Sequence, residues 1–353
     1  MVHFIQKIIE KIPFLSPLLI GLDLGTHTTK IALQGRGIVL REPTCVAIRK
    51  QPRDYIFFGM EAKTIIGKTP DFLTVHKPII NSIISDFDSE VALLRYFFDK
   101  SVYPFLKNTF IKPPLVGVSC VPYIATEIEQ KAVEEAILKT GCSSVVLIKK
   151  PIATAIGAGV AVFYHQPHCI VDIGAGTIEV SIISGGGIVS NRTIKQGGDT
   201  MDKIIQNYVH LKHGIVLGEA TCERLKINTL TFDTSQDNTE VVRGKSLENG
   251  LPKSVKIKSS ELREALTPLF TSIIDTIREI LEQSPPEVVN DVYQEGILLT
   301  GKSALIPGLH TYIKDEVHID VHIPDHAADA TIYGLLKLLT HLERLQTISL
   351  KSP

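Results

Sequence analysis

Residues 23–33 read DLGTHTTKIAL, and residues 172–182 read DIGAGTIEVSI. In this register both segments open with Asp-x-Gly, place a threonine at the same later position and continue as an apolar alternation. Short apolar stretches, residues 18–22 and 169–171, precede them. Each segment therefore predicts a strand, a tight polar turn and a second strand. One such hairpin is common in any α/β protein, but two in matching register indicate an internal duplication.

The two turns have the composition of a phosphate-binding site. Their glycines let backbone amides approach an anion closely, and their threonine hydroxyls add hydrogen-bond donors. Asp23 and Asp172 each stand at the end of the first strand of their pair, where a carboxylate can hold magnesium, mostly through water. Two such turns facing each other would enclose a nucleotide between two similar domains.

A second pair of segments supports the duplication. PIATAIGAGVAV, at 151–162, and DATIYGLL, at 329–336, predict helices in which alanine and glycine stand four residues apart. The pairs are Ala153 with Gly157, Ala155 with Gly159, and Ala330 with Gly334. Small residues at that spacing share one helix face and permit close crossing of two backbones. We expect these helices to cross at a hinge between the halves; the alternative is that each packs tightly against a sheet.

The composition predicts a folded protein with two medium-sized domains. The chain has 353 residues, 44% of them hydrophobic and 21% charged, and a net charge of −1 that points neither to nucleic acid nor to an acidic partner. Its five cysteines form no CxxC pair, which favours a reducing cytoplasm over a disulfide or metal framework. The sequence has no apolar run of about 18 residues and no secretory cleavage site. We expect a cytoplasmic protein with peripheral membrane contact.

These motifs resemble the actin, sugar kinase and heat-shock chaperone superfamily, and within it the chain is most similar to the MreB family of bacterial actins. The resemblance runs in the family's order over about residues 18–340, through GLDLGTHTTK, GRGIVLREPTCVAI, SDFDSEVALLRYF, TEIEQKAVEEAILKTG, PIATAIGAG, VDIGAGTIEVSIIS, GGDTMDKII and EGILLTG. It implies an α/β, actin-like duplicated fold, with two ribonuclease-H-like domains around a nucleotide cleft. The implied division is an N-terminal segment at 1–20, domain I at 21–160 (small subdomain about 47–86), domain II at 161–335 (small subdomain about 202–260) and a C-terminal helix at 336–353 that returns to domain I.

The resemblance also implies roles for individual residues, with ATP or ADP and magnesium as ligands. The phosphate-binding set is Gly25, Thr26, His27, Thr28, Gly174, Ala175, Gly176, Thr177, Gly197, Gly198 and Asp199. The nucleoside-binding set is Glu223, Lys226, Gly301, Lys302 and Ser303, and Asp23 and Asp172 would meet magnesium through water.

One departure from the family concerns hydrolysis. MreB proteins carry Glu-Glu-Pro before the hinge helix, and the second glutamate positions the attacking water; here the segment reads Lys149-Lys150-Pro151. A charged lysine cannot accept a proton from water, so we expect at most slow ATPase activity. Thr177 is a second candidate for a catalytic role. The alternative is that both lysines are solvated and another acidic residue serves.

Two other departures concern the loops themselves. Gly301-Lys302-Ser303 replaces three glycines at the adenine side, and Ala175 replaces a glycine in the second phosphate loop. A third pattern is misleading: residues 296–303, GILLTGKS, fit GxxxxGK[ST], but Ile-Leu-Leu-Thr reads as a buried strand rather than a phosphate-wrapping loop. We therefore expect no P-loop there.

Two apolar segments predict membrane contact. Residues 2–12, VHFIQKIIEKI, form an amphipathic helical pattern that resembles the family's N-terminal membrane helix. The predicted lipid-facing residues are Phe4, Ile5, Ile8 and Ile9, together with Phe105, Leu106, Phe110 and Ile111 of a nearby loop. The alternative is that the helix docks on the protein's own core.

The sequence thus predicts an MreB-like cytoskeletal protein that forms membrane-associated, nucleotide-bound filaments supporting cell shape or cell-wall synthesis. Its expected partners are further copies of itself, a membrane surface and proteins of wall synthesis or the cytoskeleton, without nucleic acid. One alternative is a fully active ATPase with dynamic filaments. Another is a small-molecule kinase or chaperone ATPase, which is disfavoured because the sequence has no large insertion for a substrate site.

Overall fold

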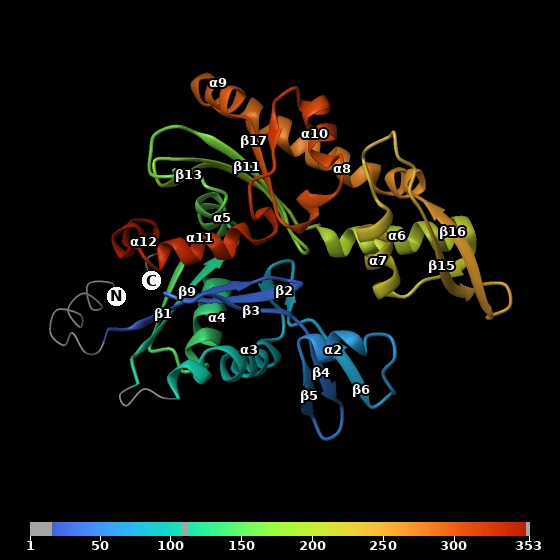
Figure 1. The fold of residues 1–353 in the computed structure, drawn as a ribbon, viewed down its shortest axis with the longest axis horizontal. Helices are drawn as coiled ribbons and strands as arrows, with labels where there is room; N and C mark the ends of the chain where they lie inside the picture. The colour runs from blue at the N-terminus through green and yellow to red at the C-terminus, as the bar shows by residue number, and fades with distance from the viewer. Residues whose placement is uncertain (1–15, 108–111, 351–353) are drawn as a thin grey trace. The chain divides into compact units, whose positions relative to one another are not determined.

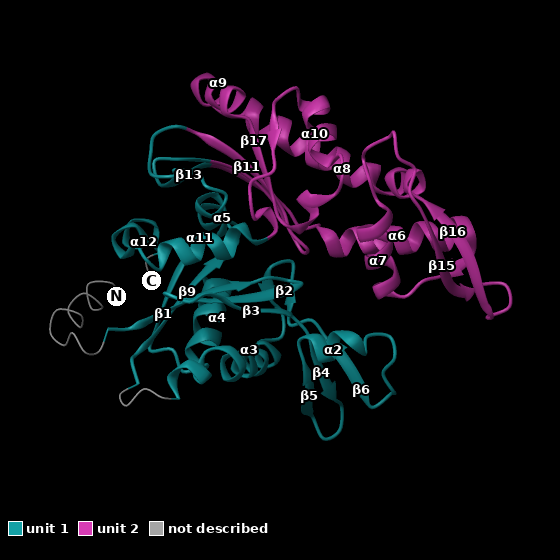
Figure 2. Ribbon diagram, in the orientation of Figure 1, with its two compact units in different colours: residues 1–166, 183–189, 329–353 teal, residues 167–182, 190–328 magenta. Residues whose placement is uncertain are grey.

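The structure is a computed structural model that describes residues 16–107 and 112–350 (Figure 1). The chain divides into two compact units, coloured separately in Figure 2. Unit 1 comprises residues 1–166, 183–189 and 329–353, and unit 2 comprises residues 167–182 and 190–328. The chain therefore returns to unit 1 after completing unit 2.

A five-stranded sheet with the order β10-β9-β1-β2-β3 forms the centre of unit 1. Its strands are β1 (Leu18–Leu24), β2 (Thr28–Leu33), β3 (Gly37–Pro43), β9 (Leu115–Val121) and β10 (Ser144–Lys149). Strands β1, β9 and β10 are parallel, whereas β1, β2 and β3 form an antiparallel meander. The central strands β1 and β9 are buried almost throughout, as their nearly continuous apolar sequences require.

Helices α3 (Phe87–Ser101) and α4 (Glu127–Leu138) contribute Leu93, Phe97 and Ile137 to the core of unit 1. Local sequence sets where both helices begin. The Asp86 side chain accepts from the Ser89 backbone N–H at the start of α3, and Thr126 and Glu129 form a capping box at the start of α4.

Shorter elements follow the meander. A three-stranded sheet, β5-β4-β6, is built from β4 (Val46–Arg49), β5 (Asp54–Phe58) and β6 (Leu73–His76), with helix α2 (Met60–Thr64). Next comes the hairpin of β7 (Ile79–Ile80) and β8 (Ile83–Ile84). A 3-10 helix, η2 (Tyr103–Leu106), follows α3.

Two helices of unit 1 cross in direct backbone contact, as the alanine–glycine spacing predicts. They are α5 (Lys150–Gly157) and α11 (Ala330–Leu338), which is followed by α12 (Leu342–Ile348). A Cβ added at Gly157 would lie 1.7 Å from the carbonyl oxygen of Ala330, and one at Gly334 would lie 1.7 Å from that of Ala153. The predicted pair of Ala155 with Gly159 was wrong: α5 ends at Gly157, and Gly159 lies beyond it with φ of +94° and open space around it.

Unit 2 repeats the strand order of unit 1. Its sheet, β13-β12-β11-β17-β18, contains β11 (His168–Ile173), β12 (Ile178–Ser184), β13 (Gly187–Ile194), β17 (Ile297–Thr300) and β18 (Val321–His322). The outer turn of the β12–β13 hairpin, residues 183–189, groups with unit 1. Strands β11, β17 and β18 are parallel. Both duplicated segments thus form the predicted strand–turn–strand.

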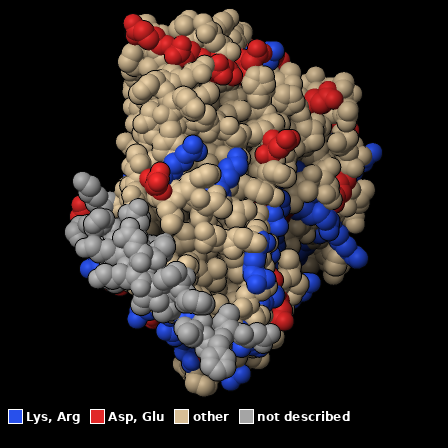
Figure 3. Space-filling view, turned by 60° about the vertical axis from the view of Figure 1, so that its left-hand side comes forward, with Lys and Arg blue, Asp and Glu red and all other residues tan. Residues whose placement is uncertain are grey.

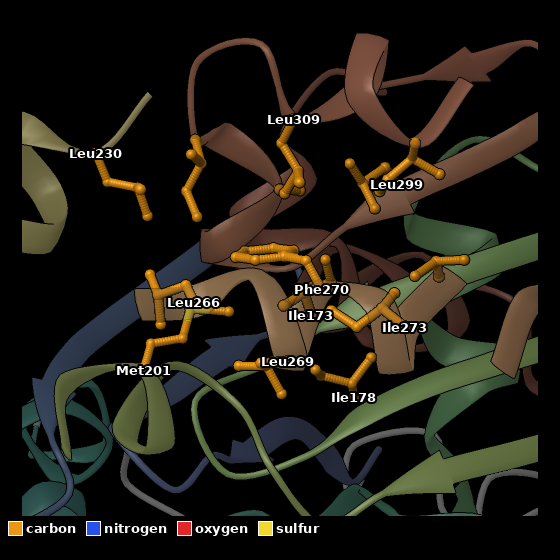
Figure 4. Close-up of a cluster of buried hydrophobic side chains, with 14 of the residues drawn as sticks. Ile173, Ile178, Met201, Leu230, Leu266, Leu269, Phe270, Ile273, Leu299 and Leu309 are labelled. Atoms are coloured by element: carbon orange, nitrogen blue, oxygen red, sulfur yellow. The ribbon is translucent and has the colours of Figure 1, made fainter. Parts of the chain in front are cut away.

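The helices of unit 2 are α6 (Gly198–His213), α7 (Glu219–Thr229), α8 (Ser259–Glu282), α9 (Pro286–Glu295) and α10 (Leu309–Val317). Figure 4 shows Phe270 of α8 among Ile173 of β11 and Leu309 of α10, all fully or almost fully buried. A small sheet of β14 (Ile215–Val216), β15 (Thr239–Ser246) and β16 (Pro252–Lys258) completes the unit.

Candidate functional site

The first Asp-x-Gly loop joins β1 to β2, and its polar groups are held by the chain around it. Asp23 and Thr26 are both 7% exposed. The Thr44 hydroxyl donates to the Gly25 carbonyl oxygen at 2.7 Å, and the Ser82 backbone N–H donates to the Thr26 hydroxyl at 2.9 Å. The loop conformation needs glycine, because a Cβ at Gly25 would lie 2.6 Å from the Thr28 carbonyl oxygen. His27 of this loop lies 2.9 Å from the Lys63 ammonium through its Nε2.

A row of charged side chains crosses the sheet beside this loop. Asp23 of β1 is directly opposite Lys30 of β2, which is directly opposite Arg41 of β3, so all three project from the same face. The Lys30 ammonium lies 3.3 Å from Asp23 and 3.3 Å from Asp329, and Arg41 contacts Asp329 at 3.0 Å. Burial alone would lower the pKa of Lys30, but attraction to the two carboxylates outweighs it and the pKa is raised. Lys30 is therefore firmly charged.

The second Asp-x-Gly loop joins β11 to β12 and rests on the start of α6. Its turn is closed by the Gly174 N–H, which donates to the Thr177 carbonyl at 3.0 Å. The Gly198 N–H donates to Gly174, and the Asp199 N–H donates to Ala175. The backbone φ of Ala175 is not positive, so alanine fits there without strain.

Distant segments also hold this second loop. Asp172 is 6% exposed and accepts a hydrogen bond from the Thr300 hydroxyl at 3.0 Å. A Cβ at Gly197 would lie 2.5 Å from the Ala175 carbonyl oxygen. The predicted adenine-side turn also packs closely against the backbone of β11. A Cβ at Gly301, where φ is +87°, would lie 2.3 Å from the Ile173 carbonyl oxygen.

Several predicted ligands of unit 2 converge on Gly198. The Lys226 ammonium donates to the Gly198 carbonyl at 2.7 Å and contacts Asp202 at 2.9 Å. A Cβ at Gly198 would lie 3.3 Å from the Lys226 ammonium and 3.5 Å from the Ser303 hydroxyl. Lys226 and Ser303 of the nucleoside set therefore meet the phosphate set at the first residue of α6, at the positive end of the helix dipole.

The other two members of the nucleoside set have less defined positions. Glu223 lies on α7 and is half-buried. Burial raises the pKa of Asp202, Lys226 opposes that shift, and Glu223 and Asp199 add to it. Lys302 begins the 3-10 helix η3 (Lys302–Leu305) and is exposed. The Ile-Leu-Leu-Thr before it is strand β17, which confirms that residues 296–303 are not a P-loop.

Lys149 and Lys150, the two lysines that the resemblance aligns with glutamates, lie where β10 passes into α5. The Lys149 ammonium donates to the Tyr123 carbonyl at 2.9 Å and lies 5.6 Å from the centre of that tyrosine ring. Lys150 is the first residue of α5 and is half-buried. Lys149 is thus engaged by Tyr123, and Lys150 follows it at the start of the helix.

The described residues do not form a complete binding site for magnesium. No group of three or more His, Cys, Asp or Glu side chains suited to a metal occurs in residues 16–107 and 112–350. The two predicted carboxylates already have protein partners, Lys30 for Asp23 and Thr300 for Asp172. The chain does not supply a resident magnesium site from these residues.

The predicted membrane residues are mostly outside the described residues: Phe4, Ile5, Ile8, Ile9, Phe110 and Ile111. Of the other two, Phe105 is 37% exposed with the Arg36 guanidinium 4.4 Å above its ring. Leu106 is 6% exposed and packs in the core of unit 1. A side chain held in the core does not face lipid, so the expectation for Leu106 is corrected.

Two further observations bear on membranes. None of the helices described is long and apolar enough to cross one. On the face shown in Figure 3, basic and acidic side chains are interspersed among large uncharged areas.

Comparison with known proteins identifies the family of this chain. Residues 18–347 match the MreB/Mbl protein family. The chain belongs to the MreB/Mbl family. It is 34% identical to the cell shape-determining protein Mbl of Bacillus subtilis, over 92% of this chain and 97% of that protein. It is 37% identical to the cell shape-determining protein MreB of Escherichia coli, over 92% and 94%.

Solved structures agree. MreB5 of Spiroplasma citri bound to AMPPNP superposes with a TM-score of 0.88 and 28% identity, covering 94% of this chain and 98% of that one. A MamK double helical filament has a TM-score of 0.76 at 20% identity, over 92% and 99%, which shows the shared fold alone. The predicted actin-like fold and MreB-like cytoskeletal identity are confirmed.

The sequence interpretation missed some residues of this MreB/Mbl site. Lys30 was detectable, because a short turn between two strands pairs Asp23 with a residue early in the second strand. Thr300 and Asp329 carried no local signal, since each reaches its loop from a segment far along the chain. Asp202 lies on α6, four residues after Gly198, and was within reach of helix spacing.

Proposed function

We propose that this protein binds an adenine nucleotide and assembles into membrane-associated filaments that support cell shape. The observation that carries the proposal is the convergence on Gly198 of the second loop, Lys226 and Ser303. That arrangement combines an ammonium, a hydroxyl and the positive end of the α6 dipole, which suit a phosphate or ribose. MreB5 of Spiroplasma citri, a 28% identical structure, is described as bound to AMPPNP and, in a second structure, to ADP.

Nucleotide binding is testable by calorimetry with ATP and ADP. Lys226→Met should weaken binding at least about tenfold, because a charge-assisted contact near Gly198 is lost. Arg224→Met on the same helix is the matched control, since Arg224 pairs instead with Glu240 at 2.8 Å. Absence of binding to the unmodified protein would contradict the proposal.

Magnesium would enter with the nucleotide and reach Asp23 and Asp172 only through water, since neither carboxylate belongs to a preformed metal site. Its chemistry would be the neutralisation of phosphate charge. The protein's own residues position the phosphates through loop amides.

We propose that hydrolysis is slow because Lys150 stands where a water-positioning carboxylate is required. Loss of such a group costs on the order of a hundredfold in rate. Lys150→Glu should raise phosphate release per polymerised subunit. Lys149→Glu makes the same charge change one residue earlier. It should not accelerate hydrolysis, because the side chain at this position is directed to the Tyr123 carbonyl. Brisk hydrolysis by the unmodified protein would end this part of the proposal.

Filament formation and membrane attachment are measured separately. Relatives at 34% and 37% identity are named cell shape-determining proteins, and pelleting with nucleotide tests whether this chain assembles. For attachment, Ile8→Glu with Ile9→Glu should reduce co-sedimentation with anionic liposomes by interrupting the apolar face that the sequence of residues 2–12 predicts. Lys7→Gln with Lys11→Gln leaves that apolar face intact and tests the electrostatic part alone. Unchanged lipid binding in the isoleucine variant would exclude the segment as an anchor.

A further inference from the structure

We propose that Lys30 is a built-in counter-cation of the first phosphate loop and that it makes nucleotide binding by this protein only weakly dependent on magnesium. The inference rests on the proposed nucleotide-binding function and adds to it a property of one loop. It starts from a disagreement: the site implied by the family needs a divalent ion beside Asp23, whereas this chain places an ammonium 3.3 Å from that carboxylate.

Strand pairing makes the position of Lys30 a fixed feature. Asp23 and Lys30 are direct partners in the β1–β2 register, and the tight loop between them sets that register. The Lys30 side chain is 14% exposed and that of Asp23 is 10% exposed, so water screens the pair far less than it screens a surface pair. The ammonium is therefore held beside the loop whether or not a ligand is present.

The neighbouring charges leave Lys30 available to Asp23. Lys30 also touches Asp329, but Asp329 is paired with Arg41 through two hydrogen bonds, at 3.0 and 3.1 Å. Burial tends to raise the pKa of Asp329, but Lys30 and Arg41 outweigh burial and lower it. Two carboxylates and two cations thus form a balanced row, and Asp23 is electrically compensated within unit 1.

The consequence for a phosphate ligand follows from Coulomb's law. An uncompensated buried carboxylate at the end of β1 would repel phosphate oxygens bound by the adjoining loop amides, and a metal would be needed between them. With the ammonium of Lys30 in place, that repulsion is offset by the protein. Magnesium then adds less to binding than it would at a bare aspartate.

The test is a calorimetric titration of the full chain with ADP and with ATP, in magnesium and in EDTA. For the unmodified protein, removing the metal should change Kd by less than about tenfold. In Lys30→Met, which keeps an unbranched side chain but removes the charge, metal removal should weaken binding by more than about tenfold. Lys30→Arg should keep the weak dependence, because it restores the cation.

A double variant tests whether a change in metal dependence comes from a general structural defect. Lys30→Met with Asp23→Asn removes both charges, so its metal dependence should return to the unmodified level even though two buried residues have changed. Lys100→Met is a control for charge alone, since Lys100 pairs with Glu42 at 2.7 Å; its metal dependence should match the unmodified protein.

The outcomes separate the two proposals. No nucleotide binding in either buffer overturns the proposed function, and the inference falls with it. Tight binding in magnesium that is lost in EDTA by the unmodified protein overturns the inference alone. Equal metal dependence in Lys30→Met and the unmodified protein also overturns it, because the ammonium would then not compensate Asp23.

Discussion

The two Asp-x-Gly loops share a backbone plan but differ in what surrounds them. In the first loop the aspartate faces the ammonium of Lys30, and the glycine is required by the loop's own Thr28 carbonyl. In the second loop the aspartate accepts from the hydroxyl of Thr300. The backbone of Gly197 also packs closely against Ala175 of the second loop, and that of Gly301 packs closely against Ile173 of the strand before it. Both glycines come from segments distant along the chain. Duplication thus fixes the path of each loop, while the rest of each unit supplies its partners.

The largest expected effect tests whether the second loop depends on distant packing. Gly301→Ala should destabilise the protein by about 4 kcal/mol, because its Cβ would meet the Ile173 carbonyl at 2.3 Å with φ at +87°. Gly25→Ala should cost less, because the clash lies within one short loop that can shift. Thermal unfolding measures both.

Gly214→Ala is the control for backbone strain in the same unit. Its φ is +64°, but nothing lies within 4 Å of the added Cβ. We expect a cost of about 1 kcal/mol. If Gly301→Ala and Gly214→Ala were equally mild, the second loop would not depend on close packing and the contrast between the loops would disappear.

Glu90 is a buried carboxyl group of unit 1 that, unlike Asp23, has no cation such as Lys30 beside it in the described part of the chain. Glu90 is fully buried, and its carboxyl oxygens have no hydrogen-bond partner among the described residues. Burial raises the pKa of Glu90 from 4.5 to about 8. The folded state therefore holds this proton more tightly than the unfolded state does. The resulting stability is fully present below pH 4.5 and is lost as the pH rises through 8.

Glu90→Gln should remove that loss. Relative to the unmodified protein, the variant should gain about 2–3 kcal/mol between pH 5 and pH 9, since local relaxation reduces the full cost of a buried charge. Urea unfolding at several pH values provides the comparison. A stability difference that does not vary with pH would show that Glu90 is not protonated in the folded protein.

The smallest effect concerns the turn that donates to the first loop. Asn81 and Ser82 both have positive φ, 50° and 62°, and this backbone conformation is unfavourable for serine. Ser82→Gly should raise stability by about 0.5–1 kcal/mol while keeping the N–H that donates to Thr26. Asn81→Gly should gain less, because asparagine tolerates this conformation. A lower melting temperature in Ser82→Gly would mean that the serine is not strained.

Local patterns explain what the sequence could predict. The two strand–turn–strand segments and the crossing at Gly157 and Gly334 follow from short-range spacing. The crossing pair at Gly159 failed because α5 ends before it. The cation beside Asp23 was within reach of register arguments, but Thr300 and Asp329 depend on how whole segments pack, and no local spacing encodes that.

The crossing of α5 and α11 has the geometry of a homodimer interface inside one chain. Gly157 meets Ala330, Gly334 meets Ala153, and the hydroxyls of Thr154 and Thr331 lie 2.9 Å apart at the centre. This reciprocity is what two copies of one polypeptide make about a two-fold axis. In a true homodimer one mutation would alter both contacts, whereas here each glycine can change alone. Because the helices are rigid, however, a methyl group on either glycine would separate both pairs of backbones at once.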